Sequence, residues 1–182
     1  MPRFVTVFGG ANPTEPDYHQ ALRLGKLLAQ AGCSVLTGGY IGTMEAVSRG
    51  AAESGGHVIG VTCAEIEAWR KVSANRWVME ERRFPTLRER LYALIDGCQA
   101  AIALPGGPGT LAEIALMWNN LLIGAIEPRP LILVGSGWQE TFKQFYHAFD
   151  PYIPERQRLW LTFAPHVDSA VEQILERLPH QP

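Results

Sequence analysis

A glycine-rich segment between an apolar run and a helical pattern is the strongest chemical signal in the chain. It reads Ala100-Ala-Ile-Ala-Leu-Pro-Gly-Gly-Pro-Gly-Thr-Leu-Ala-Glu113, with Gly106, Gly107 and Gly109 in the turn. Glycines let backbone N–H groups approach an anion, and the N-terminus of a helix beginning near Thr110 adds partial positive charge. Because the segment lacks the lysine of a P-loop, it predicts a monophosphate-binding loop. An ordinary turn between a strand and a helix is the alternative.

A second glycine loop has the same placement. Gly39 and Gly42 follow a short apolar run, and a helical pattern opens at Thr43 and Met44. We therefore expect these four residues to form a second wall of the same ligand-binding crevice. The loop is not a dinucleotide-binding fingerprint. A third and shorter loop, residues 9–12, is interpreted as a simple turn.

Two charged residues lie in helical patterns near these loops. Glu113 is expected in the first turn of its helix, where it either complements the helix dipole at the surface or faces the pocket. Arg90 lies beside the apolar face formed by Leu87, Leu91 and Leu94. Such an arginine is usually a solvated or snorkelling side chain, and a functional role is the alternative.

Apolar runs rich in β-branched residues alternate with longer helical patterns along the chain. The runs predict buried parallel strands, and Thr14 with Pro16 marks the start of the first helix. The expected strands are Phe4–Phe8, Ser34–Thr37, His57–Thr62, Ala100–Leu104 and Pro130–Val134. The expected helices are 14–31, 43–53, 86–95, 110–122, 139–149 and 167–178.

This alternation predicts an α/β fold, a Rossmann-like doubly wound parallel sheet with helices on both faces. Such sheets bind ligands at the carboxyl ends of their strands.

The stretch 65–85, which contains Trp69, Trp77, Arg82 and Arg83, is interpreted as solvated surface or as a lid over the crevice. The region after Pro151 is interpreted as a closing strand or a packing segment.

Composition narrows the class of protein. The formal net charge is −2, which argues against a strongly basic nucleic-acid-binding surface. The balance of 47% hydrophobic and 19% charged residues is typical of one globular domain, expected over residues 1–182. Three scattered cysteines predict buried, reduced thiols. The beginning MPRFVTVFGG has no signal-peptide or membrane-span pattern, so a cytoplasmic protein is expected.

With these motifs in view, the chain resembles the lonely-guy (LOG) family, which is often mislabelled as lysine decarboxylases. The resemblance runs from about Val5 to Val134 and includes the upstream Gly38-Gly39-x-x-Gly42 loop and Arg90. The PGGxGTxxE motif of the family is present in full as Pro105, Gly106, Gly107, Gly109, Thr110 and Glu113.

The resemblance implies a phosphoribohydrolase that cleaves the N-glycosidic bond of N6-modified AMP, giving free cytokinin base and ribose 5-phosphate. It implies Arg90 and Glu113 as the catalytic pair and Gly107, Gly109 and Thr110 as the phosphate cradle. It also implies a homodimer, or an assembly of dimers, with the site near the subunit interface. The substrate partner would be a small nucleoside monophosphate, with no nucleic-acid or membrane partner.

A carboxylate beside the sugar would stabilise the positive charge that develops as an N-glycosidic bond breaks, or would act as a base for water. No metal is expected, since the five histidines are scattered without ligand spacing. No cofactor is expected either. Pyridoxal phosphate, which the decarboxylase label would imply, needs a Schiff-base lysine, and Lys26, Lys71 and Lys143 lie outside the crevice loops.

The chain departs from the usual family pattern in two segments. Leu91 follows Arg90 where the family usually has lysine, and Tyr40, Thr43 and Glu45 replace glycine, leucine and glycine. A protein that binds a nucleotide or a phosphorylated cofactor without hydrolysing it is therefore the alternative function.

Overall fold

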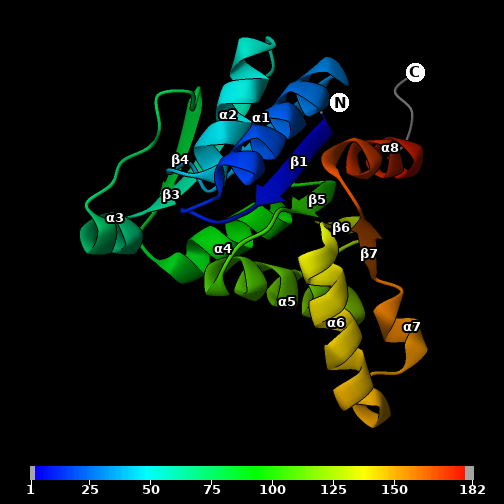
Figure 1. Ribbon diagram of the computed structural model, residues 1–182. Helices are drawn as coiled ribbons and strands as arrows, with labels where there is room; N and C mark the ends of the chain where they lie inside the picture. The colour runs from blue at the N-terminus through cyan, green and yellow to red at the C-terminus, as the bar shows by residue number, and fades with distance from the viewer. Residues whose placement is uncertain (1–2, 179–182) are drawn as a thin grey trace.

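Seven strands form one parallel sheet at the centre of residues 3–178, the part of the chain that the computed structural model describes (Figure 1). The strand order is β4-β3-β2-β1-β5-β6-β7, and every neighbouring pair is parallel. The predicted α/β class is confirmed, while residues 1–2 and 179–182 of the predicted domain lie outside the described residues. The strands are β1 (Arg3–Phe8), β2 (Cys33–Thr37), β3 (Val58–Cys63), β4 (Glu80–Phe84), β5 (Ala100–Ala103), β6 (Leu131–Val134) and β7 (Leu161–Ala164).

Helices cover both faces of the sheet, because strand residues point alternately to either side (Figure 1). Val5 and Val7 pack with α1, α2 and α8, whereas Phe8 and Leu36 pack with α4, α5 and α6. None of the helices in this part of the chain is both long and apolar enough to cross a membrane. The helices are α1 (Glu15–Gln30), α2 (Thr43–Glu53), α3 (Ala64–Arg70), α4 (Leu87–Asp96), α5 (Pro108–Leu122), α6 (Ser136–Ala148), the 3₁₀ turn η1 (Asp150–Tyr152), α7 (Glu155–Arg158) and α8 (Val167–Arg177).

Local capping signals explain where two of these helices begin. The Thr14 hydroxyl accepts a hydrogen bond from the Asp17 N–H, as the sequence predicted for α1. Thr86 and Glu89 form a reciprocal capping box at the start of α4. The start of α4 is therefore fixed by its own sequence, and this fixes the helix position of Arg90.

The stretch 65–85 is more ordered than the sequence indicated. It contains α3 and the edge strand β4, which the interpretation as solvated surface or lid did not include. β4 reads Glu-Glu-Arg-Arg-Phe, and such charged residues are common on edge strands, where they prevent pairing with other chains. Arg82 Nε lies 2.7 Å from Glu80 Oε1. Because four of its five residues are charged, this segment lacks the apolar pattern by which strands are recognised in a sequence. The closing strand expected after Pro151 is confirmed as β7.

The strand order creates one point at which neighbouring connections diverge. From β1 the chain moves outward through β2, β3 and β4, and α4 then returns it to β5 on the other side of β1. The loops after β1 and β5 therefore leave the same sheet edge in different directions. A crevice at the carboxyl ends of adjacent strands is the usual ligand site of such sheets.

The close packing of α1 on α2 gives a testable consequence. A Cβ atom at Gly25 would stand 2.0 Å from the Val47 carbonyl oxygen, whereas one at Gly137 would meet nothing within 4 Å. We expect Gly25→Ala to lower the free energy of unfolding by about 1–3 kcal/mol, because two backbones must separate. Gly137→Ala is the control and should be neutral or stabilising by up to about 1 kcal/mol. Urea unfolding measures both, and equal effects would contradict the packing described.

Candidate active site

Three loops meet at the carboxyl edge of the sheet. The Thr43 N–H and hydroxyl both donate to the Gly10 carbonyl oxygen, at 3.0 and 2.9 Å. A Cβ atom at Gly42 would lie 2.3 Å from the Ala11 carbonyl oxygen, and one at Gly106 would lie 3.1 Å from the Gly10 nitrogen. The loop at residues 9–12 is thus more than the simple turn that its sequence indicated, because it packs between the other two loops.

The N-terminus of α5 is open toward solvent and has no side-chain cap. The helix begins at Pro108, two residues before the expected start at Thr110, and Gly107 in the N-cap position offers no side chain. A Cβ atom at Gly107 or Gly109 would meet nothing within 4 Å, so both glycines border open space. First-turn N–H groups without a cap are suited to bind an anion. Thr110 is buried below the loop, where a Cβ at Gly106 would approach its Oγ1 to 2.2 Å.

Glu113 lies inside the protein and not on the helix surface. Because α5 begins at Pro108, this residue is in the second turn, so the expectation of a first-turn position was wrong. It is only 8% exposed, which also excludes the alternative of a surface carboxylate. Glu113 follows Gly109 by four residues, which places both on the same helix face. The Glu113 Cα therefore lies about 6 Å along the helix axis from that of Gly109.

Arg90 is buried as well, contrary to the usual solvated position of such an arginine. It is 4% exposed, and its Nε donates to the Val61 carbonyl oxygen at 2.7 Å. Its Nη2 donates to the Gly38 carbonyl oxygen at 3.3 Å, and its Nη1 lies 3.7 Å from Glu113 Oε1. A Cβ atom at Gly38 would approach Nη2 to 2.0 Å. The guanidinium thus occupies space that only a glycine in the β2 loop leaves free.

Burial dominates the electrostatics of this pair. Desolvation raises the pKa of Glu113 to about 7, and the positive charge of Arg90 opposes part of that rise. Near neutral pH the carboxyl group is therefore present in both the protonated and the ionised form. Such a group can accept or donate a proton at little energetic cost, as general acid–base chemistry requires.

The remaining predicted ligand-binding residues pack the loops together. Gly39 has φ +76°, and a Cβ there would lie 2.9 Å from the Thr62 methyl carbon. Met44 is buried, with its sulfur 2.5 Å from the position of a Cβ at Gly38. Gly39, Gly42, Thr43 and Met44 thus lie where the loops pack against each other, while Gly107 and Gly109 border open space.

Sequence reasoning missed two residues that contact this centre. The ring centroid of Tyr40 lies 5.6 Å from the Arg90 guanidinium carbon, and Gly10 connects the three loops. The glycine pair at Gly9 and Gly10, directly after an apolar run, was the only available signal for the second of these. No local pattern in the sequence relates Tyr40 to Arg90, because they meet only in the folded chain.

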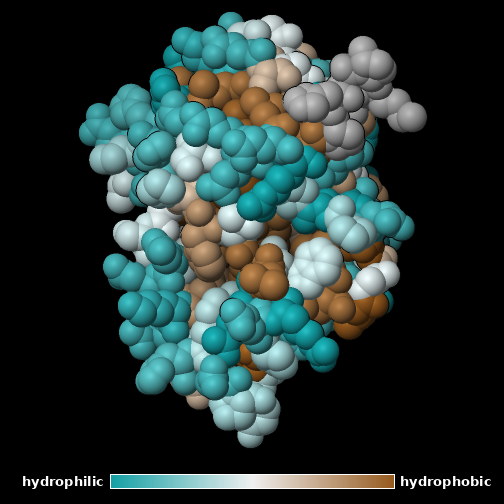
Figure 2. All heavy atoms as spheres, turned by 90° about the vertical axis from the view of Figure 1, so that its right-hand side faces the viewer, coloured by the Kyte–Doolittle hydropathy of each residue, from teal (hydrophilic) through white to brown (hydrophobic). Residues whose placement is uncertain are grey.

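Other features lie away from this centre. A cavity of about 750 Å³ lies at the β7 edge of the sheet, lined in part by Tyr146, Arg158 and Arg177, and includes none of the predicted site residues. Hydrophobic side chains reach the surface in patches on this side of the molecule (Figure 2). Within residues 3–178, no three His, Cys, Asp or Glu side chains form a group that could hold a metal ion.

Comparison with known proteins finds relatives that are named for nucleotides and one that is named for a cofactor. The model of the SLOG cluster4 family matches residues 2–147. A rice protein (Oryza sativa subsp. japonica) named probable cytokinin riboside 5'-monophosphate phosphoribohydrolase LOGL9 is 32% identical over 97% of this chain and 79% of its own length. The pyrimidine/purine nucleotide 5'-monophosphate nucleosidase of Escherichia coli K12 is 29% identical over 84% of this chain and 34% of its own length. Among solved structures, the molybdenum cofactor binding protein of Rippkaea orientalis superposes with a TM-score of 0.76 at 25% identity, covering 97% of both chains.

Titration of Glu113 should make stability depend on pH. Its folded-state pKa of about 7 exceeds the ordinary value of 4.5, so the folded protein holds a proton that the unfolded chain has released between these values. The stabilisation is complete below pH 4.5 and is lost as pH rises to 7, by up to about 3 kcal/mol. Urea unfolding at pH 5 and pH 8 should show a larger loss for the wild type than for Glu113→Gln, which cannot titrate. Equal losses in the two proteins would contradict the burial of an ionisable carboxyl group.

Proposed function

The chain belongs to the SLOG cluster4 family, and we propose that it is an enzyme that hydrolyses the N-glycosidic bond of nucleoside 5'-monophosphates to free base and ribose 5-phosphate. One observation carries the proposal. A buried carboxyl group, Glu113, lies one helical turn from an uncapped helix N-terminus and beside a buried arginine, Arg90. This arrangement can hold a phosphate at one end and act on a sugar at the other.

The phosphate of the substrate would accept hydrogen bonds from the first-turn N–H groups of α5, next to Gly107 and Gly109. One helical turn further, Glu113 would face the ribose ring. The C1'–N bond breaks and its electron pair leaves with the base, while a water oxygen bonds to C1'. The proton that this water loses balances the step by ending on the base nitrogen, which gives the neutral free base. Ionised Glu113 stabilises the positively charged sugar or takes a proton from that water, and both roles require the carboxylate form.

Arg90 would keep part of the Glu113 carboxyl group ionised at neutral pH. Without a neighbouring cation, burial would raise the pKa of Glu113 further, and less of the ionised form would exist at neutral pH. A guanidinium held by two backbone carbonyl groups supplies this charge in a fixed place. Arg90 would thus support the reaction in two ways. It keeps Glu113 partly ionised, and its positive charge neutralises negative charge on the substrate.

The relatives support an AMP-type substrate. The rice relative is named for a cytokinin riboside 5'-monophosphate, and the E. coli relative for purine and pyrimidine nucleotide 5'-monophosphates. We therefore propose AMP, with or without a substituent on N6, as the substrate class.

A binding protein without hydrolytic activity is the second candidate. It is favoured by the likeness to the Rippkaea protein, which is named for molybdenum cofactor binding. An uncapped helix N-terminus can hold the phosphate of either ligand. The buried pair of Arg90 and Glu113 favours catalysis, because simple phosphate binding does not need a carboxyl group that titrates near neutrality.

The cellular setting is part of the same proposal. We propose one nucleotide-binding domain over residues 1–182, acting in the cytoplasm as a homodimer or an assembly of dimers, without a nucleic-acid partner. The single sheet supports one domain, and the net charge of −2 argues against a nucleic-acid partner.

Purified protein incubated with AMP or N6-isopentenyl-AMP should release free base and ribose 5-phosphate, which chromatography separates. Glu113→Gln and Arg90→Ala should each lower kcat by about 10²-fold or more, because each removes a charge that acts on the transition state. Glu172→Gln, an exposed change in α8, is the matched control and should keep full activity. Nucleotide binding without any release of base by the wild type would instead support the binding protein.

The reaction should also require the ionised form of Glu113. With a pKa of about 7, the rate should fall about tenfold for each pH unit below that value. A profile of kcat/KM from pH 5 to pH 9 measures this acid limb. A profile that stays flat between pH 5 and pH 7 would remove Glu113 from the proposed role.

A further inference from the structure

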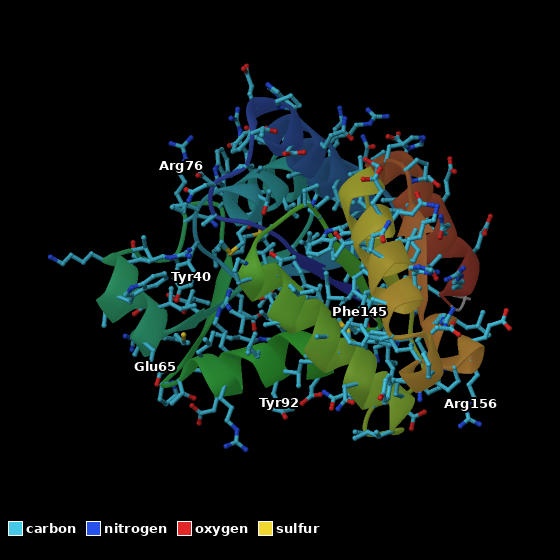
Figure 3. All side chains as sticks on the ribbon, turned by 60° about the horizontal axis from the view of Figure 1, so that its bottom comes forward. Tyr40, Glu65, Arg76, Tyr92, Phe145 and Arg156 are labelled. Atoms are coloured by element: carbon cyan, nitrogen blue, oxygen red, sulfur yellow. The ribbon has the colours of Figure 1, made fainter. Side chains whose placement is uncertain are left out.

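The buried hydroxyl of Tyr40 makes two hydrogen bonds to one residue of a neighbouring strand. It is 1% exposed, and its hydroxyl accepts a hydrogen bond from the Cys63 N–H at 2.7 Å and donates one to the Cys63 carbonyl oxygen at 3.0 Å. Cys63 is the last residue of β3, so the phenol joins the loop after β2 to the end of the neighbouring strand. In Figure 3 Tyr40 lies within the molecule, whereas Tyr92 points outward from α4.

The two segments that Tyr40 joins are also the two that bind Arg90. The guanidinium donates to the carbonyl groups of Gly38, two residues before Tyr40, and Val61, two residues before Cys63. The Tyr40 ring itself lies 5.6 Å from the guanidinium carbon, within the range of a cation–π contact. Tyr40 therefore fixes both acceptors of Arg90 and supplies part of the surface on which it rests.

Asn75 holds the same loop from the other side. Its N–H donates to the Gly39 carbonyl oxygen at 2.8 Å, and its Nδ2 donates to the carbonyl oxygens of Gly39 and Tyr40 at 3.0 and 2.9 Å. Its Oδ1 accepts from the Trp77 N–H at 3.1 Å, which fixes the direction of the side-chain amide. The connection between α3 and β4 is thus attached to the β2 loop through one residue.

These constraints matter because the ion pair alone does not fix the arginine. The distance of 3.7 Å between Arg90 Nη1 and Glu113 Oε1 is longer than a hydrogen bond. This contact therefore supplies an opposite charge but does not fix the orientation of the guanidinium. The position of the guanidinium relative to Glu113 depends on its carbonyl acceptors and on the aromatic ring below it.

We propose that Tyr40 and Asn75 are positioning residues that hold the Arg90 guanidinium in place relative to Glu113. Asn75 holds the β2 loop, Tyr40 joins that loop to the end of β3, and the resulting frame holds the guanidinium at its distance from the carboxyl group. The role of these residues in catalysis rests on the proposed hydrolase function, whereas their effect on Arg90 does not.

The first test is Tyr40→Phe, which keeps the ring and removes both bonds to Cys63. Tyr146→Phe is the matched control, because the buried Tyr146 hydroxyl has no hydrogen-bond partner among the described residues and lies on α6. We expect Tyr40→Phe to lower kcat about 10-fold to 100-fold with little change in KM. The acid limb of the rate profile should move to higher pH, because a displaced Arg90 opposes the raised pKa of Glu113 less.

The second test is Asn75→Asp, which removes the two side-chain donors and keeps the acceptor for Trp77. It provides an independent variant if Tyr40→Phe does not fold. Asn119→Asp, at an exposed position of α5, is its control. The same loss of kcat and the same shift of the acid limb are expected for Asn75→Asp and not for its control.

An activity-independent readout separates this proposal from the proposed function. The Nε–H of Arg90 should exchange slowly with solvent in the wild type, followed by NMR, and at least tenfold faster in Tyr40→Phe and Asn75→Asp. Exchange at wild-type rates in a folded variant of either kind overturns the proposal, as do kinetics and a pH profile that match those of the controls. If the wild type releases no base, the proposed function fails, and the exchange rates alone decide the positioning role.

Discussion

The burial of one arginine and one carboxyl group at the end of a parallel sheet is the constraint on which the rest of the site depends. Removing a charge from water is costly unless other groups compensate it. Two backbone carbonyl groups and an aromatic face surround the Arg90 guanidinium, and Glu113 supplies the nearby opposite charge. Because the compensation of Glu113 is incomplete, its pKa rises into the neutral range.

The strand order brings these groups together. β1 lies between β2 and β5, so the loops after these three strands meet at one edge, and α4 passes from β4 back to β5. This return places Arg90 below the β2 loop and beside α5, which carries Glu113. Glycine is required where these elements come closest, at Gly38 against the guanidinium and at Gly42 against the β1 loop. The pair of Arg90 and Glu113 therefore depends on contacts between elements far apart in the sequence.

Local sequence patterns predicted the α/β class, five strands by their ranges and the glycine loops, because each of these signals lies within a few residues. They also offered β7, as one of two interpretations of the region after Pro151. The same reasoning did not detect β4. Its charged residues suit an edge strand, but they do not alternate with apolar residues as strand patterns usually do. It also did not predict the burial of Arg90, since the carbonyl groups that bind it belong to Val61 and Gly38, far away along the chain. The resemblance to a family named Arg90 and Glu113 as a pair, but the environment of that pair required the fold.

The likeness of this chain both to proteins named as hydrolases and to one named for cofactor binding is understandable in these terms. An uncapped helix N-terminus binds phosphate whatever the rest of the ligand is, so the fold serves more than one ligand class. Burial also raises the pKa of the Glu113 carboxyl group to about 7, so this group can exchange a proton near neutral pH. By holding Arg90 in place, Tyr40 and Asn75 would help to keep the Glu113 carboxyl group partly ionised near neutral pH.

A crystal structure of the Glu113→Gln variant with bound AMP tests this account most directly. The account predicts the phosphate at the first-turn N–H groups of α5, beside Gly107 and Gly109, with C1' of the ribose facing the side chain at position 113. A phosphate bound away from the start of α5, or a ribose turned away from position 113, would contradict it.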